Sequence, residues 1–158
     1  MASGIRSGTV PRTSVGSRLL AVVRTPARRL AARRTTWAYG MVRLRLARHG
    51  AGKTLAWACR PTRGPAVDPD AAWWSAQSLV RRGRLPGNCL VRSVVLARVL
   101  ASGGRRPSIR LGVRREGAGI RAHAWVEMDG RTYGEDDGFH RLGRVGDRVR
   151  PGGHKDHR

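Results

Sequence analysis

Cysteine is scarce in this sequence, which contains only Cys59 and Cys89. The two residues form no CxxC pair and show no regular spacing, so the pattern indicates neither a disulfide framework nor a structural zinc site. Two isolated thiols are typical of a protein that works in a reducing compartment.

Long apolar runs are also missing. A helix needs about 20 consecutive apolar residues to cross a bilayer, and the nearest candidate, Leu19–Val23, is cut off by Arg24. The same run is too short for the apolar region of a secretory signal. We therefore expect a soluble, cytoplasmic protein, whose hydrophobic content of 40% suffices for one core.

Acidic residues are few. The 10 Asp and Glu residues stand against 32 Lys and Arg residues, which gives a formal net charge of +22. Clustered cations bind phosphate backbones by releasing counterions. Here, however, the arginines are scattered over all segments and form no binding stripe, so we expect no nucleic acid partner. Contact of the basic N-terminal region with an anionic membrane surface or an acidic peptide stays open.

Four regions differ in composition. Residues 1–16 show no apolar period and are predicted to be a disordered tail, as are residues 148–158. Residues 17–60 alternate short apolar groups with arginines, which predicts a basic helical extension of one or two amphipathic helices. Within it, Val42, Leu44 and Leu46 also alternate as in a strand. Residues 66–147 are predicted to form the domain itself.

One stretch of the extension, Gly50–Thr54, ends in Gly-Lys-Thr as phosphate-binding loops do. The complete pattern needs a glycine at the position of Ala47, and it needs a preceding strand. Neither condition is met, so we interpret the stretch as a connection between helices.

The domain is predicted to begin with a helix that follows a Pro- and Gly-rich break at 61–65. Asp68 is a candidate N-cap, Pro69 suits the first helical position, and Gly83 ends the helix. Its tryptophans, Trp73 and Trp74, are expected to pack at the core and its rim.

A second helix carries a cysteine in its first turn. A Pro-Gly turn and Asn88, a candidate cap, precede Cys89, and a mostly apolar helix then runs to Gly103–Gly104. At such a helix start, free amide hydrogens and the helix dipole stabilise a thiolate and can hold an oxyanion. The alternative for a free cysteine is burial as a small hydrophobe, which applies to Cys89 taken alone and which we favour for Cys59.

After this helix the apolar period becomes two, which predicts strands over 109–113 and 120–128. His123 lies on the face of the second strand opposite its apolar residues. An Asp-Gly hairpin turn then returns the chain to an acidic cluster, Glu135-Asp136-Asp137. A two-residue loop places Asp136 opposite His123, whereas a loop with a bulge at Gly130 places Glu135 there. Either register predicts the Cys-His-acid arrangement of papain-like enzymes.

Three stretches together resemble a known family: Cys89–Ser93, Leu111–Val113, and Ala122–Glu127 ahead of an Asp-Gly turn. They are similar to the peptidase of lasso-peptide maturation, a transglutaminase-like cysteine protease. The resemblance covers the second half of the chain well and extends weakly upstream. It implies an α+β fold with a transglutaminase-like (papain-like) core, in which the nucleophile helix packs on a small antiparallel sheet.

By that resemblance, Cys89 matches the nucleophile and His123 the general base. Glu135 stands where the family more often has aspartate, and Asp136 is the fallback. We favour Glu135 because the bulged hairpin and the family spacing agree. The implied activity is cleavage of the peptide bond that joins the leader of a lasso precursor to its core, without a metal or an organic cofactor.

The resemblance also implies partners. We expect no fused leader-binding domain, because the chain is short and its N-terminal third is too basic and irregular for one. The chain is therefore similar to the split form, in which a separate leader-recognition protein presents the precursor peptide and a lasso cyclase takes the product. Two alternatives stay open. One is a transglutaminase-like acyltransferase, and the other is a non-catalytic protein in which Cys89 belongs to the core and the arginines bind nucleic acid or membrane.

Overall fold

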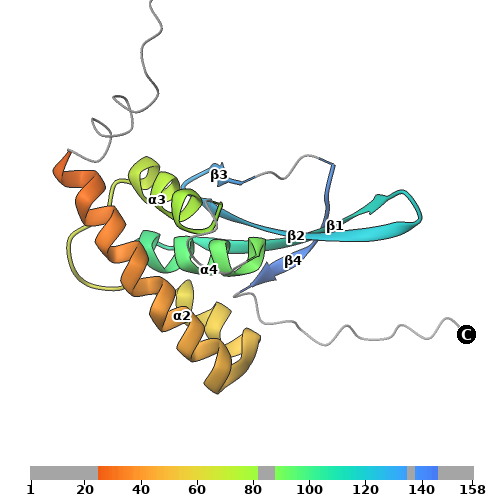
Figure 1. Cartoon of the computed structure of the whole chain (residues 1–158), viewed down its shortest axis with the longest axis horizontal. Helices are drawn as coiled ribbons and strands as arrows, with labels where there is room; N and C mark the ends of the chain where they lie inside the picture. Colours follow the sequence, from red (N-terminus) through yellow and green to blue (C-terminus); the bar gives the residue numbers. More distant parts are fainter. Residues whose placement is uncertain (1–24, 82–87, 135–137, 146–158) are drawn as a thin grey trace, which may run out of the picture.

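The computed structural model describes residues 25–81, 88–134 and 138–145. They form an α+β fold of helices packed on an antiparallel sheet with strand order β3-β2-β1-β4 (Figure 1). The elements are α2 (Pro26–Ala58), α3 (Pro69–Arg81), α4 (Cys89–Leu100), β1 (Ser108–Glu116), β2 (Gly119–Met128), β3 (Arg131–Tyr133) and β4 (His140–Val145). The predicted tails and the acidic cluster at 135–137 lie outside the described residues.

Helix α4 is the centre of the fold. It packs against β2 and β1 on one side and against α2 and α3 on the other. This position explains why the helix is apolar on most faces: Val94, Val95, Leu96 and Ala97, four consecutive residues, are all fully buried. A helix that is apolar all round has to be enclosed by other elements.

Helix α2 shares that core. Ala38, Val42 and Leu55 belong to the same buried cluster as the apolar residues of α4 and the sheet. In the described residues, α2 of the predicted extension therefore packs in the same core as the predicted domain at 66–147. Within the described ranges, no helix combines the length and the apolar character needed to cross a membrane.

A kink divides α2 at Gly50, whose backbone leaves the helical region with φ 71° and ψ 179°. Thr54 Oγ1 donates a hydrogen bond to the carbonyl of Gly50 at 2.7 Å, which links the two segments. The predicted connection between helices is confirmed here. The strand interpretation of Val42, Leu44 and Leu46 is wrong, because these residues lie in the first helical segment, where packing on α4 selects the helical period.

Both predicted caps are present. The amide of Ala71 donates to Asp68 Oδ1 at 2.8 Å at the start of α3. The amide of Val91 donates to Asn88 Oδ1 at 3.1 Å at the start of α4. Each side chain thereby satisfies one of the amide groups that a helix start leaves without an intrahelical partner.

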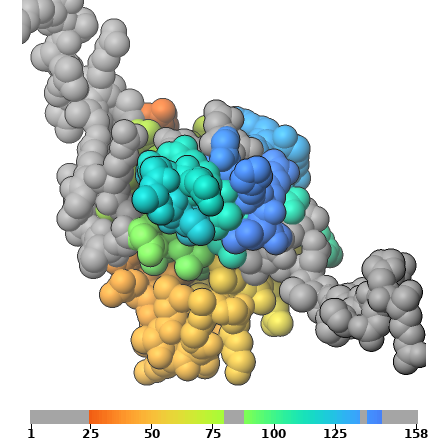
Figure 2. Space-filling view, turned by 90° about the vertical axis from the view of Figure 1, so that its right-hand side faces the viewer, coloured from red at the N-terminus to blue at the C-terminus, as the bar shows by residue number. Residues whose placement is uncertain are grey.

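The hairpin of β1 and β2 extends past the helices, and its tip lies beside β4 and above α2 in the perpendicular view (Figure 1, Figure 2). The next hairpin has a two-residue loop, because Met128 pairs with Arg131 and both Asp129 and Gly130 have positive φ. The predicted bulge is therefore wrong. A loop with two positive φ values matches the twist of the strands that it joins.

Candidate active site

A cavity of about 650 Å³ opens where α3, α4 and the outer edge of the sheet meet. Strand β3 pairs only with residues 126–128 of β2, so the rest of this edge of β2 has no strand neighbour in the described parts of the chain. The start of α4 lies beside this open edge. The lining residues are Trp73, Gln77, Cys89, Arg92, Arg121, Ala122, His123, Thr132 and Gly134.

Cys89 is the first residue of α4 and is partly buried. Its neighbour Asn88 caps the helix, so the local sequence fixes the thiol at the helix start. The amides of the first turn and the positive end of the helix dipole lie there, and both favour negative charge. This placement is the one that supports a reactive thiolate.

His123 lines the same cavity from β2 and is also partly buried. Its imidazole stacks on Phe139, with ring centroids 5.1 Å apart and planes 27° apart. On the same strand, Trp125 stacks on it at 6.4 Å and 20°. The imidazole is therefore oriented by aromatic neighbours from two segments of the chain.

Trp125 is fully buried on the face of the sheet that points away from α4. Gly112 of β1, which pairs with His123, leaves the space that the indole fills, since a Cβ there would lie 2.8 Å from Trp125 Cη2. Phe139 also contacts the indole, at a centroid distance of 6.4 Å. Trp125 and Phe139 thus form a packed group of side chains next to His123.

The side chain of Glu127 contacts this group. Its carboxylate accepts hydrogen bonds from Arg110 Nε at 2.7 Å and from Trp125 Nε1 at 3.4 Å, and pairs with Arg141 at 3.3 Å. Burial raises the pKa of Glu127, but the hydrogen bonds from Arg110 and Trp125 and the charges of Arg110 and Arg141 outweigh it. The net pKa lies below that of an ordinary glutamate, so the group is an anion at neutral pH.

The comparisons with known proteins agree with this architecture. A family model described as the Transglutaminase-like superfamily matches residues 21–145, most of the chain. The chain belongs to the transglutaminase-like superfamily. Cysteine-based catalysis is typical of that superfamily. No curated protein and no solved structure was found to match the chain.

The transglutaminase-like domain brings two of the predicted site residues, Cys89 and His123, to one cavity. Glu135 and Asp136 lie outside the described residues. Gly134, directly before them, lines the cavity and has a φ of 123°, and the pairing of β2 with β3 ends at Tyr133. The described part of the hairpin ends before the acidic cluster, so its register does not decide between Glu135 and Asp136.

The residues that surround Cys89 and His123 in the structure were not singled out in the sequence analysis. Arg92 lines the cavity, donates to Gln77 Oε1 at 3.5 Å and lies over the ring of Trp73 at 5.8 Å. Phe139, the sole phenylalanine of the chain, was also missed, although its rarity and its position after the acidic cluster were a signal. Cys59 packs against the hydrophobic core, as predicted for a small hydrophobe. Within the described ranges, no group of three or more His, Cys, Asp or Glu residues could hold a metal ion.

Proposed function

We propose that this transglutaminase-like chain is a cysteine endopeptidase that removes the leader peptide from a lasso-peptide precursor. The observation that carries the proposal is that Cys89, at the start of α4, and His123, on β2, line one cavity. Among the described residues, the part of β2 beside that cavity has no strand partner, and an extended peptide bound there would meet its backbone groups.

In the proposed reaction, His123 takes the proton of the Cys89 thiol, and the sulfur attacks the carbonyl carbon at the leader–core junction. Amides in the first turn of α4 stabilise the negative oxygen of the tetrahedral intermediate. His123 then gives the proton to the leaving amine, and the C–N bond breaks. Water attacks the thioester, which releases the leader as an acid and restores the thiol.

A carboxylate beside His123 would hold the imidazole in the correct tautomer and stabilise its protonated form. We assign this role to Glu135, with Asp136 as the alternative. Because the bulged hairpin is wrong, the assignment to Glu135 now rests on the family spacing alone. Two positively charged side chains, Arg92 and Arg121, line the cavity, and their charge would favour the oxyanion that forms in the reaction.

The choice of a lasso precursor as substrate rests on the resemblance of Cys89–Ser93, Leu111–Val113 and Ala122–Glu127 to the lasso leader peptidases. The same resemblance supports a separate leader-recognition protein that presents the precursor, and a cyclase that joins the new amino terminus to an acidic side chain. The superfamily also contains the chemistry for acyl transfer, in which an amine replaces water in the last step.

The test is mass spectrometry of a candidate precursor incubated with the full chain and its presumed recognition protein. Cleavage at one bond, lost in Cys89→Ala and His123→Ala but retained in Cys59→Ala, is the expected result. The Cys59 variant removes the other thiol of the chain and so controls for loss of a cysteine as such. Equal rates with and without the recognition protein would contradict the split arrangement.

Two other results would replace the proposal. A product whose mass includes an added amine would assign the protein to acyl transfer. Cleavage that persists in Cys89→Ala would remove this residue from the reaction.

A further inference from the structure

Helix α4 buries a hydroxyl group among its apolar side chains. Ser93 is 4% exposed, and the residues that follow it, Val94 and Val95, are fully buried. A buried hydroxyl costs free energy unless it has a hydrogen-bond partner. Inside a helix, serine often finds that partner in the carbonyl four residues earlier. Ser93 Oγ instead donates to the carbonyl of Ala124 on β2, at 2.8 Å, so the sheet satisfies it.

The two ends of this hydrogen bond adjoin the two candidate reacting groups. Cys89 lies four residues before Ser93, so their side chains share a face of α4 and are about 6 Å apart along the helix axis. On the other side of the bond, Ala124 directly follows His123 on β2. The bond therefore joins α4 to β2 next to the cavity that Cys89 and His123 line.

The strand register explains why the carbonyl of Ala124 is available. Met128 and Arg131 flank a two-residue loop and form a hydrogen-bonded pair, which turns the N–H and C=O of Met128 toward β3. Backbone groups alternate sides along a strand, so the C=O of Ala124 points to the same edge. The pairing of β2 with β3 reaches only to Val126. Among the described residues, the hydroxyl of Ser93 takes the place of a strand partner for Ala124.

The other contacts of His123 do not set its distance from α4. Its imidazole stacks on Phe139 and Trp125, and both rings belong to segments other than α4. These contacts orient the plane of the imidazole. The bond between Ser93 and Ala124 spans the gap between the helix and the strand, and a misplacement of about 1 Å can lower a reaction rate about 100-fold.

We propose that Ser93 is a positioning residue for precursor cleavage. Its hydrogen bond to Ala124 holds the imidazole of His123 at the distance from the Cys89 sulfur that proton transfer requires. Ser93 is not among the residues that line the cavity, so it acts through the backbone of β2 and not on the substrate. The inference rests on the proposed peptidase function.

The kinetics of precursor cleavage by the full chain and its recognition protein test this role. Ser93→Ala removes the donor and keeps a good helix former. We expect kcat to fall about 10- to 100-fold while KM stays within about twofold, because the residues that line the cavity are unchanged. Ser93→Thr restores a hydroxyl and should recover most of the loss. Ser93→Cys, a weaker donor of similar size, supplies the same measurement if Ser93→Ala does not fold.

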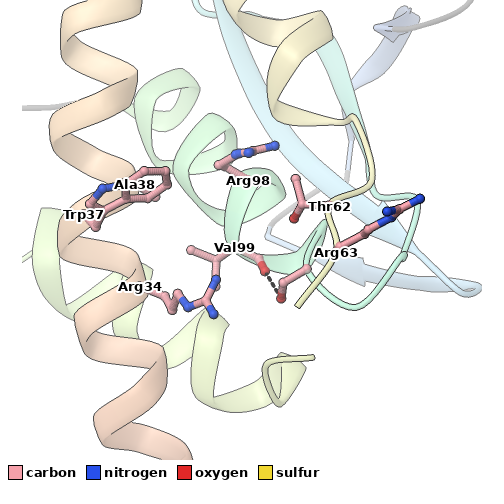
Figure 3. A pocket seen from close by; sticks show the side chains of 8 residues that line it. Arg34, Trp37, Ala38, Thr62, Arg63, Arg98 and Val99 are labelled. Atoms are coloured by element: carbon pink, nitrogen blue, oxygen red, sulfur yellow. Dashed lines mark hydrogen bonds between the residues drawn. The ribbon is translucent and has the colours of Figure 1, made fainter. Parts of the chain in front are cut away.

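Ser102 is the matched control. It is 3% exposed, and its hydroxyl donates to the carbonyl of Val99 at 2.8 Å, the bond drawn as a dashed line in Figure 3. This bond has the same length as that of Ser93 but lies at the end of α4 far from Cys89, and it joins α4 to no strand. Ser102→Ala should therefore change kcat less than about twofold. A loss of kcat in Ser93→Ala no larger than in Ser102→Ala would overturn the proposal, as would equal changes in kcat and KM.

A second measurement needs no precursor and so separates the positioning role from the proposed function. Cys89 is alkylated with iodoacetamide at neutral pH, and its modification is followed by mass spectrometry. We expect His123→Ala and Ser93→Ala each to slow alkylation about 3- to 10-fold, because an adjacent base activates the thiol, and Ser102→Ala to leave the rate unchanged. This order of rates without precursor cleavage by the unmodified chain would reject the leader-peptidase function and still support the placement of His123 by Ser93. An unchanged rate in Ser93→Ala would overturn the positioning role even if the precursor is cleaved.

Discussion

The imidazole of His123 stacks on the ring of Phe139 at a centroid distance of 5.1 Å. The guanidinium of Arg114 also lies over that ring, 4.7 Å from its centroid. The three side chains form a short stack that ends at the cavity containing Cys89. In the proposed mechanism His123 is the general base, and because a general base works only in a narrow range of orientations, the stack would influence that proposed role.

Removing the stacked ring should slow the reaction. Aromatic pairs contribute about 0.5–1.5 kcal/mol beyond the burial of their area, so we expect Phe139→Ala to lower kcat for precursor cleavage about 2- to 10-fold. KM should change little, since the ring is not among the residues that line the cavity. Phe139→Tyr keeps the stack and should restore kcat. A parallel rise in KM, or no rescue by tyrosine, would mean that the ring only supports the fold.

The carboxylate of Glu127 should make stability depend on pH. Its pKa is depressed in the folded protein, so its contribution is present above the unfolded value of about 4.3 and is lost as the pH falls through the lower folded value. We expect Glu127→Gln to lower the free energy of unfolding by about 1–3 kcal/mol at neutral pH, and by less under acid conditions.

Urea titrations between neutral and acid pH measure this difference for Glu127. Glu116→Gln is the matched control, because the Glu116 side chain is 54% exposed in its pair with Arg121 and should contribute less than about 1 kcal/mol. A stability loss in Glu127→Gln that is the same at every pH would contradict the electrostatic explanation.

Gly112 should tolerate no side chain. A Cβ there would lie 2.8 Å from the Trp125 ring and 3.0 Å from the carbonyl oxygen of His140, and neither group can move freely. We expect Gly112→Ala to lower the free energy of unfolding by about 1–3 kcal/mol. Gly143→Ala, on β4, meets nothing within 4 Å and should change it by less than about 0.5 kcal/mol. Equal melting temperatures for the two variants would refute this account of the packing.

The Asn88 cap of α4 should affect both the free energy of unfolding and the reactivity of the Cys89 thiol. Asn88→Ala removes the acceptor for the amide of Val91, and we expect a loss of about 1 kcal/mol in unfolding free energy. Asn88→Ser restores an acceptor and should recover most of it. Alkylation of Cys89 by iodoacetamide, followed by mass spectrometry, should slow in Asn88→Ala if fraying of the first turn disturbs the thiolate site. An unchanged alkylation rate would show that the cap does not influence the reactivity of Cys89.

Two matched substitutions can decide which residue of the acidic cluster acts as the orienting carboxylate. We expect Glu135→Gln to lower kcat about 100-fold or more, as loss of an orienting carboxylate does in other triads, and Asp136→Asn to have a much smaller effect. The measurement is single-turnover cleavage of the precursor by each variant. The reverse order of effects would assign the role to Asp136.

Much of the fold was predictable because it depends on near neighbours in the chain. The caps by Asp68 and Asn88, the first-turn position of Cys89 and the alternation around His123 each follow from the chemistry of a few adjacent residues. The hairpin at Asp129 and Gly130 was predicted for the same reason, since glycine permits the backbone angles that tight turns need.

The rest was decided by contacts between distant segments. Only tertiary packing brings Cys89 and His123 to one cavity and places Phe139 on the imidazole. It also places the indole of Trp125 against Gly112, where there is no room for a side chain. The loop length at Asp129 and the inclusion of α2 in the core also depend on the strand twist and on burial. By itself, the sequence determined which chemical groups the protein has and which local structures carry them. The tertiary structure decided which of those groups meet, because the burial of apolar surface stabilises contacts between residues whether they are near or far apart along the chain.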